Sequence, residues 1–156
     1  MKRIALDTDA VNRILDTPGL LEAIKDAAGR GCFILIGNHV VRDQLVATPD
    51  HARRARLLEI YDALPRKDVL TKGGIFNISR YGAARYGDGS DTGISLSEAR
   101  TAGRGGGHDA LIATTAAGEA DVLVTNDKEL TAKVKVSAAQ IEVWTFEGFI
   151  QFVRSS

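Results

Sequence analysis

Short apolar segments recur along the chain and have the pattern of buried β-strands. Most are continuous rather than alternating, and the clearest is Cys32-Phe-Ile-Leu-Ile36. A strand without alternation is typical of a parallel sheet that is covered on both faces. The strands expected from this pattern are Arg3–Leu6, Cys32–Ile36, a weaker Asp68–Thr71, Asp121–Val124 and Ile141–Trp144.

The segments between these strands carry helical periodicity and helix-capping residues. Asn38 stands where an N-cap is expected, and Ser95 with Glu98 forms a capping box. The predicted helices are Val11–Leu15, Leu20–Ala28, Asn38–Ala47, Thr48–Leu64, Ser95–Gly103, Asp109–Ala117, Lys128–Val134 and Phe146–Val153. Regular alternation of strands and helices predicts right-handed crossovers between parallel strands. We therefore expect an α/β fold, a three-layer α/β/α sandwich around a mostly parallel central sheet.

The length of the chain fits a single domain. With 156 residues, one hydrophobic core suffices, so we expect residues 1–156 to form one unit. The stretch from Thr71 to Gly107 is too long for a structureless loop in a compact domain. We expect it to be an elaborated segment of the same domain.

Composition excludes several classes of protein. Twenty basic residues balance twenty acidic ones, so the chain lacks the excess positive charge of a basic nucleic-acid-binding domain. Its one cysteine, Cys32, cannot form an internal disulfide, and no Cys/His zinc spacing is present. The apolar stretches fall far short of the roughly 20 residues that span a membrane. We expect a cytoplasmic protein with no membrane segment and no secretory signal.

Four acidic residues are candidates for a site, and two of them stand beyond the carboxyl ends of strands, where an open parallel sheet binds its ligands. Asp7 follows the first strand, Asp127 follows the Asp121–Val124 strand, Asp109 opens a predicted helix and Asp43 lies within another. Asp7 and Asp109, like Asp9, lie near helix starts, where an Asp is explained by capping or by the helix dipole alone. Four carboxylates at one sheet edge would repel each other unless they bind cations or share protons. Oxygen ligands without Cys or His favour Mg²⁺ or Mn²⁺.

Three segments resemble the signature segments of the PIN-domain ribonucleases, which include the VapC-like toxins of bacterial toxin-antitoxin pairs. They are Ile4-Ala-Leu-Asp-Thr-Asp9, His108-Asp-Ala-Leu-Ile-Ala-Thr-Thr-Ala116 and Val122-Leu-Val-Thr-Asn-Asp-Lys-Glu-Leu130. The resemblance implies an α/β/α sandwich and an endoribonuclease that hydrolyses RNA phosphodiester bonds with Mg²⁺ or Mn²⁺ held by a carboxylate quartet. Asp7, Asp109 and Asp127 match the family's acids directly.

The chain departs from this family at two positions. Asp43 stands on the helix where the family usually has Glu, and its shorter side chain would reach a metal through water. Asp9 replaces a common Asn or Ser, and either tightens metal binding or caps the helix that begins at Ala10; we favour the cap. Thr125 and Asn126 resemble family positions that orient the last acid through hydrogen bonds.

Several basic residues are candidates for substrate binding. Arg53 and Arg54 lie on one predicted helix and could contact phosphates, although such a face is equally often simply solvated. Arg104 lies in Gly103-Arg-Gly-Gly-Gly107, which we interpret as a flexible approach to Asp109 because it lacks the ending of a P-loop. His108 could contact a phosphate or serve only as a turn residue.

Two other functions remain open. A catalytically degenerate module would bind RNA or a protein partner without cutting, which is plausible because Asp43 stands where Glu is expected. Asp7-Thr-Asp9 also matches the Asp-x-Asp motif of haloacid-dehalogenase-like phosphatases, but the 126–156 stretch leaves little room for their remaining catalytic residues. We favour the metal-dependent endoribonuclease, and expect it to form a homodimer or to bind a cognate antitoxin.

Overall fold

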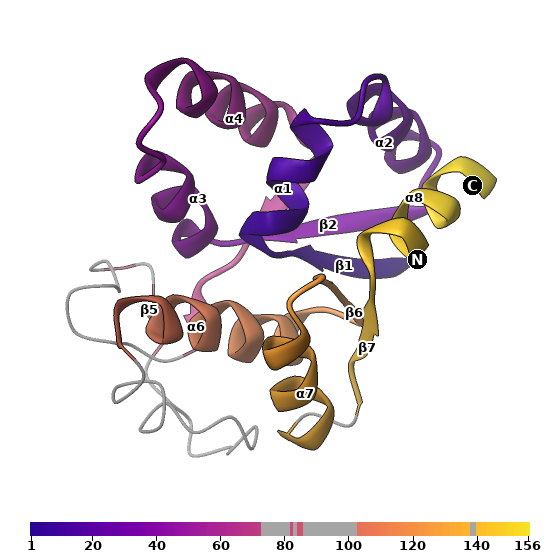
Figure 1. The fold of residues 1–156 in the computed structure, drawn as a ribbon. Coiled ribbons are helices and arrows are strands. Elements are labelled where there is room, and N and C mark those ends of the chain that lie inside the picture. Colours follow the sequence, from indigo (N-terminus) through magenta and orange to yellow (C-terminus); the bar gives the residue numbers. More distant parts are fainter. Residues whose placement is uncertain (73–81, 83, 86–102, 138–139) are drawn as a thin grey trace.

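The computed structural model describes residues 1–72, 82, 84–85, 103–137 and 140–156 (Figure 1). Most of the elaborated segment, including the helix expected at Ser95–Gly103, lies outside the described residues. Gly103 is the first residue of α6 that the structure describes.

The centre of the fold is a five-stranded sheet in which every pairing is parallel. The strand order is β3-β2-β1-β6-β7. The strands are β1 (Lys2–Leu6), β2 (Phe33–Gly37), β3 (Arg66–Asp68), β6 (Val122–Val124) and β7 (Glu142–Trp144). Ile4 of β1 is paired with Leu35 on one side and Val122 on the other, so β1 is the middle strand.

Helices cover both faces of the sheet, as the sequence predicts. They are α1 (Thr8–Leu15), α2 (Leu20–Gly29), α3 (His39–Val46), α4 (His51–Ala63), α6 (Gly103–Glu119), α7 (Lys128–Ser137) and α8 (Phe146–Ser155). Helices α1 to α4 lie on one side of the sheet in Figure 1, and α6 and α7 lie on the other. The reason is topological. The chain steps in one direction from β1 to β3 and in the opposite direction from β6 to β7, so right-handed crossovers place the two sets of helices on opposite faces.

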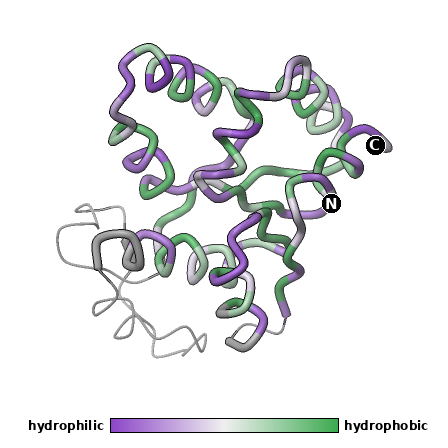
Figure 2. Tube along the Cα trace, viewed as in Figure 1, coloured by the Kyte–Doolittle hydropathy of each residue, from purple (hydrophilic) through white to green (hydrophobic). Residues whose placement is uncertain are grey.

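The core lies on both sides of the middle strands. Ile4, Leu35 and Leu123 are fully buried, one from each of β1, β2 and β6. Figure 2 shows hydrophobic residues along these strands and on the inward sides of the helices. The continuous apolar pattern of Cys32–Ile36 therefore correctly predicted a doubly covered strand, although the strand begins at Phe33 and ends at Gly37.

The weak strand expected at Asp68–Thr71 is wrong in its boundaries. Arg66–Asp68 forms the edge strand β3, and Thr71–Lys72 forms β4, which pairs with β5 (Ala84–Arg85) in a separate two-stranded sheet. An edge strand has only one neighbour to pack against, so its sequence, Arg-Lys-Asp, carries no hydrophobic signal that could have located it.

Helix α6 is longer than predicted, and this changes the place of Asp109. The glycine-rich segment Gly103–Gly107 is helical and is not a flexible approach, so Asp109 lies in the second turn of α6 instead of at its start. Glycine lowers helix propensity, but packing of the buried residues Leu111 and Ile112 stabilises the helix that these glycines extend. Among the described residues, no helix has the length and apolar character needed to cross a membrane.

Candidate carboxylate site

Strands β1 and β6 are neighbours in the main sheet. The chain leaves β1 toward one edge of the sheet, through β2 and β3, and leaves β6 toward the other edge, to β7. Such a switch point leaves a crevice beyond the carboxyl ends of the strands, where ligands of open α/β sheets bind. Asp7 follows β1 and Thr125 follows β6 at this point. The backbone N–H of Asp7 donates to the carbonyl of Val124 at 3.2 Å, which ties the two strand ends together.

Asp7 is the best-defined acid of the site. It is the N-cap of α1, and its Oδ1 accepts a hydrogen bond from the backbone N–H of Ala10 at 2.7 Å. Only 5% of the residue is exposed. Burial, together with the charges of Asp9 and Asp109, raises the pKa of Asp7 to about 6, although hydrogen bonds from Thr125 and Ala10 act in the opposite direction. A desolvated carboxylate crowded by like charges is a favourable ligand for a cation.

Thr125 connects Asp7 to the other strand end. Its hydroxyl donates a hydrogen bond to the Asp7 carboxylate and accepts one from the backbone N–H of Asp127 at 3.1 Å. The residue is 2% exposed. The sequence predicted that Thr125 orients the last acid; the structure places its hydroxyl between the first acid and the backbone of the last one.

Asp109 lies close enough to Asp7 for its charge to raise the pKa of Asp7. It is half-buried and extends from α6, which covers the sheet face opposite α1. The site therefore brings together acids from two layers of the sandwich. The sequence predicted Asp109 at a helix N-terminus, which is wrong because α6 begins earlier in the chain; its shared role with Asp7 stays a prediction.

Asp127 caps the helix that follows it. Its Oδ1 accepts hydrogen bonds from the backbone N–H groups of Glu129 at 2.8 Å and Leu130 at 3.0 Å, which caps the first turn of α7. The residue is exposed. Its other carboxylate oxygen has no role in this cap, and its place in the carboxylate quartet stays a prediction.

Helix α3 reaches the site through a residue that the sequence analysis did not select. Asp43 is half-buried within α3, as predicted. A hydrogen bond that joins α3 to α1 runs from the hydroxyl of Thr8 to Oε1 of Gln44, the next residue along the helix after Asp43. Thr8 directly follows Asp7. Its position next to Asp43 on the same helix could have indicated Gln44, but its side chain is an uncharged amide and so did not suggest a site residue.

Two further predictions are corrected by the contacts around the site. Asp9 is not the cap of the first helix: Asp7 is, and Asp9 lies in the first turn, where its Oδ2 pairs with Nε of Arg13 at 2.7 Å. Asn126 does not bond to the last acid, since its Oδ1 accepts a hydrogen bond from the backbone N–H of Phe146 at 2.8 Å and so anchors the start of α8.

The arginines expected to bind substrate have partners within the protein. Arg53 forms a two-pronged ion pair with Asp16 at 3.0 and 2.9 Å, and its proximity lowers the pKa of that carboxyl. Arg54 donates to the carbonyl of Thr48 at 3.2 Å and contacts the ring of His51. Both guanidinium groups therefore have partners within the protein. Arg53 links α4 to the end of α1, and Arg54 bonds to groups at the start of α4.

The remaining two substrate candidates lie on α6. The side chain of Arg104 is outside the described residues. His108 is half-buried in the helix, so it is not a turn residue as we considered from the sequence. It stands directly before Asp109 in the chain.

The donor set fits a magnesium-type cation in part. No group of three or more His, Cys, Asp or Glu side chains is arranged to hold a metal within the described ranges. Asp7 and Asp109 supply two carboxylates near each other, and Mg²⁺ commonly binds proteins through one or two carboxylates while it keeps several waters. The pair is compatible with such a hydrated ion, and the full quartet stays a prediction.

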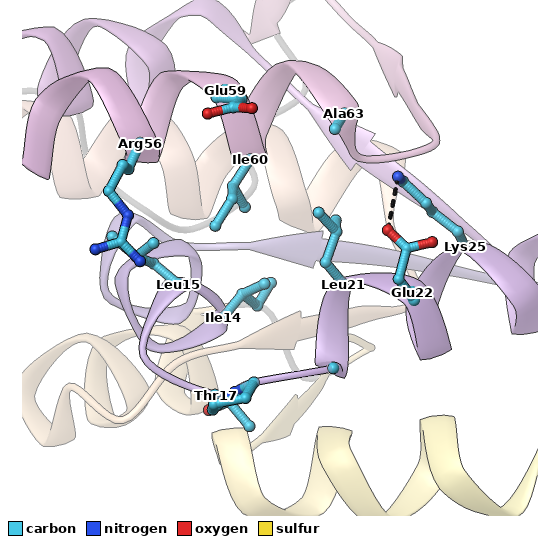
Figure 3. A pocket seen from close by; sticks show the side chains of 12 residues that line it. Ile14, Leu15, Thr17, Leu21, Glu22, Lys25, Arg56, Glu59, Ile60 and Ala63 are labelled. Atoms are coloured by element: carbon cyan, nitrogen blue, oxygen red, sulfur yellow. Dashed lines mark hydrogen bonds and ion pairs between the residues drawn. The ribbon is translucent and has the colours of Figure 1, made fainter.

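A separate pocket of about 400 Å³ lies at the other end of α1 (Figure 3). Ile14, Leu21 and Ile60 form its apolar floor, and Glu22 and Lys25 pair across its rim at 3.0 Å. Because Asp7 caps the opposite end of this helix, roughly 10 Å away at 1.5 Å per residue, the pocket is not part of the carboxylate site.

Comparisons of the chain with protein-family models, curated proteins and solved structures gave no match.

Proposed function

We propose that this chain is a metal-dependent endoribonuclease, similar in its chemistry to the PIN-domain ribonucleases that three of its segments resemble. The observation that carries the proposal is the buried Asp7, whose pKa is raised to about 6 at the switch point of the sheet, with Asp109 beside it. A buried carboxylate costs stability unless a bound cation compensates for it. Residues that cost stability in this way are typical of functional sites.

The proposed work of each residue follows from its contacts. Asp7 and Asp109 would hold Mg²⁺ or Mn²⁺, and the chemistry that such an ion would supply is polarisation of a scissile phosphate and activation of a water for in-line attack. Thr125 keeps the Asp7 carboxylate ionised and oriented by hydrogen bonding. Asp127 and Asp43 are proposed to contribute through water. The substrate would be RNA, and the place of action the cytoplasm.

A protein partner is a second part of the proposal. The family resemblance suggests an antitoxin that offers an arginine to the acidic pocket, or a homodimer. Charge complementarity supports the first arrangement, because a guanidinium group would relieve the repulsion between Asp7 and Asp109 in the absence of metal.

The contacts around Asp7 argue against the phosphatase alternative and are consistent with the degenerate module. In a haloacid-dehalogenase-like phosphatase the second acid of Asp7-Thr-Asp9 must act on the substrate, but Asp9 pairs with Arg13 at 2.7 Å. The degenerate module is favoured because Gln44, an α3 residue that contacts Thr8 beside Asp7, has an amide side chain and not a carboxylate. It therefore stays the second candidate.

The test is cleavage of a labelled single-stranded RNA by the purified chain. We expect internal cuts with Mg²⁺ or Mn²⁺, none in excess EDTA, and none by the Asp7→Asn variant, whose amide oxygen can still cap α1. Binding without metal-dependent cleavage would favour the degenerate module. Cleavage that persists in EDTA would overturn the proposal.

A further inference from the structure

A groove of about 550 Å³ runs between α7 and α8 beside the carboxylate site. One end is formed by Thr125 and Asn126, which follow β6 at the carboxyl edge of the sheet. Its two walls are lined by Lys128, Thr131, Ala132 and Lys135 of α7 and by Thr145 and Glu147 at the start of α8. The groove thus leads away from the place where Thr125 contacts Asp7.

One face of α7 is directed at this groove. The α7 residues that line it are spaced i, i+3, i+4 and i+7, which is the spacing of a single helical face. Lys128 and Lys135 stand at the two ends of this face, and both are exposed. Ala132 between them has a small side chain that leaves the middle of the face open.

The two lysines have no ion-pair partner in the part of the chain that the structure describes. Other lysines differ: Lys2 pairs with Glu142 and Lys25 pairs with Glu22, at 3.1 and 3.0 Å. The acid of the groove, Glu147, lies 4.0 Å from Arg13 on α1. The groove therefore has a net positive charge that internal pairs do not neutralise.

We propose that this groove binds the phosphate backbone of a single RNA strand as it leaves the carboxylate site, with Lys128 and Lys135 as the phosphate contacts. The inference rests on the proposed function for its choice of ligand. Seven residues of helix separate the lysines by about 10 Å, and a stacked strand advances about 3.4 Å per phosphate, so they would contact phosphates about three nucleotides apart. The hydroxyls of Thr131 and Thr145 can donate to phosphate oxygens between them.

This placement replaces the arginines of α4 as the expected substrate contacts. Arg53 is held by Asp16, whereas the α7 lysines are unpaired within the described residues and adjoin Thr125. The bulk charge balance of the chain concealed this local excess, because it counts the site acids together with the groove lysines.

Binding can be tested separately from cleavage. The Asp7→Asn variant, which is expected to leave RNA uncut, is titrated with a fluorescent single-stranded oligoribonucleotide at several salt concentrations. Each phosphate contact to a single strand contributes about 0.7 to the slope of log affinity against log salt. Adding Lys128→Ala and Lys135→Ala should reduce that slope by about 1.4 and the affinity by about 25-fold near 0.1 M salt.

Matched variants separate this result from a loss of folding or of general charge. Lys2→Ala with Lys25→Ala also removes two positive charges, outside the groove, and should leave affinity and slope within about twofold. Lys128→Arg with Lys135→Arg should restore binding, because Arg keeps the charge. Unchanged affinity and slope in the double alanine variant, or an equal loss in the Lys2 and Lys25 control, would overturn the inference.

The outcome is distinguishable from a failure of the proposed function. If the wild-type chain does not cut RNA but the lysines control its binding, the groove inference holds and the nuclease proposal fails. If it cuts RNA with no dependence of binding on the lysines, the reverse is true. Preference for an acidic peptide over RNA in a competition titration would also overturn the inference.

Discussion

The hydroxyl of Thr125 donates a hydrogen bond to the carboxylate of Asp7. The two residues come from strands far apart in the sequence but adjacent in the sheet, and each directly follows its strand. The bond favours the ionised form of a carboxylate that burial and neighbouring acids would otherwise neutralise. It partly offsets burial, which has the largest effect on the charge state of the proposed site.

The first prediction removes this bond. Thr125→Val keeps the shape of the side chain but removes the hydroxyl, so the pKa of Asp7 should rise above about 6. The pH at which metal-dependent cleavage reaches half its maximum should move upward, while Thr125→Ser should resemble the wild type. The measurement is a pH profile of cleavage, together with an NMR titration of the Asp7 carboxyl. A profile that stays in place or moves downward contradicts this role of Thr125.

The second prediction concerns stability and pH in the metal-free protein. Because the folded-state pKa of Asp7 is raised from 3.8 to about 6, the native state binds the proton more tightly than the unfolded chain. The stability that this group contributes is present below pH 3.8 and is lost as the pH rises to about 6. Asp7→Asn removes the loss, so above pH 6 the variant should be more stable than the wild type by up to about 3 kcal/mol.

Urea unfolding in EDTA at pH 4 to 8 measures this difference. The gain from Asp7→Asn should be smallest near pH 4 and should reach a plateau above pH 6. Saturating Mg²⁺ should reduce the difference by stabilising only the wild type. A variant that is less stable than the wild type at pH 7 in EDTA would show that Asp7 is stabilising when ionised, against this account.

The third prediction uses the amide that joins α3 to α1. Gln44→Glu places a carboxylate beside Thr8, next to Asp7, and should tighten Mn²⁺ binding by about tenfold, or about 1.4 kcal/mol, because it adds a negative charge near the site. Calorimetric titration measures the affinity. Asp43→Asn is the matched comparison and should weaken binding by less than Gln44→Glu strengthens it. Unchanged affinity in Gln44→Glu would place α3 outside the metal site.

The fourth prediction concerns His39, the first residue of α3. Both ring nitrogens are buried and have no hydrogen-bond partner among the described residues. A buried polar group without a partner costs about 1 to 3 kcal/mol, so His39→Leu should raise the free energy of unfolding by about 1 kcal/mol. Urea unfolding of the two proteins is the measurement. A decrease would indicate that the ring nitrogens are satisfied in solution, by water or by a ligand.

The sequence was sufficient to predict the parallel sheet and the position of Asp7 at the end of its first strand. Apolar runs such as Phe33–Gly37 have their pattern because both faces of the strand are covered, so the signal is local. Asp7 was found because it directly follows such a strand. Thr125 was found by resemblance, and its bond to Asp7 required the pairing of β1 with β6, which no local pattern contains.

The errors arose where distant contacts decide the outcome. The ion pair of Arg53 with Asp16 joins two helices, so a row of arginines in the sequence could not show that one of them is engaged. Asp9 resembled a helix cap, but the register of the first turn assigns that role to Asp7 and turns Asp9 toward Arg13. The helical state of Gly103–Gly107 depends on packing farther along α6, against the local propensity of glycine.

The central claim is that Asp7 and Asp109 form a metal-dependent cleavage site, and one comparison of variants tests it most directly. Asp9 and Asp109 both raise the pKa of Asp7, so neutralising either one changes the charge near it in the same direction. Of these two residues, only Asp109 is proposed to hold the metal together with Asp7. In single-turnover cleavage of RNA at saturating Mg²⁺, we expect Asp109→Asn to be slower by at least about 100-fold, as for the loss of a metal-orienting group, and Asp9→Asn to stay within a few-fold of the wild type. Equal rates for Asp109→Asn and the wild type, or equal losses in both variants, would contradict the account.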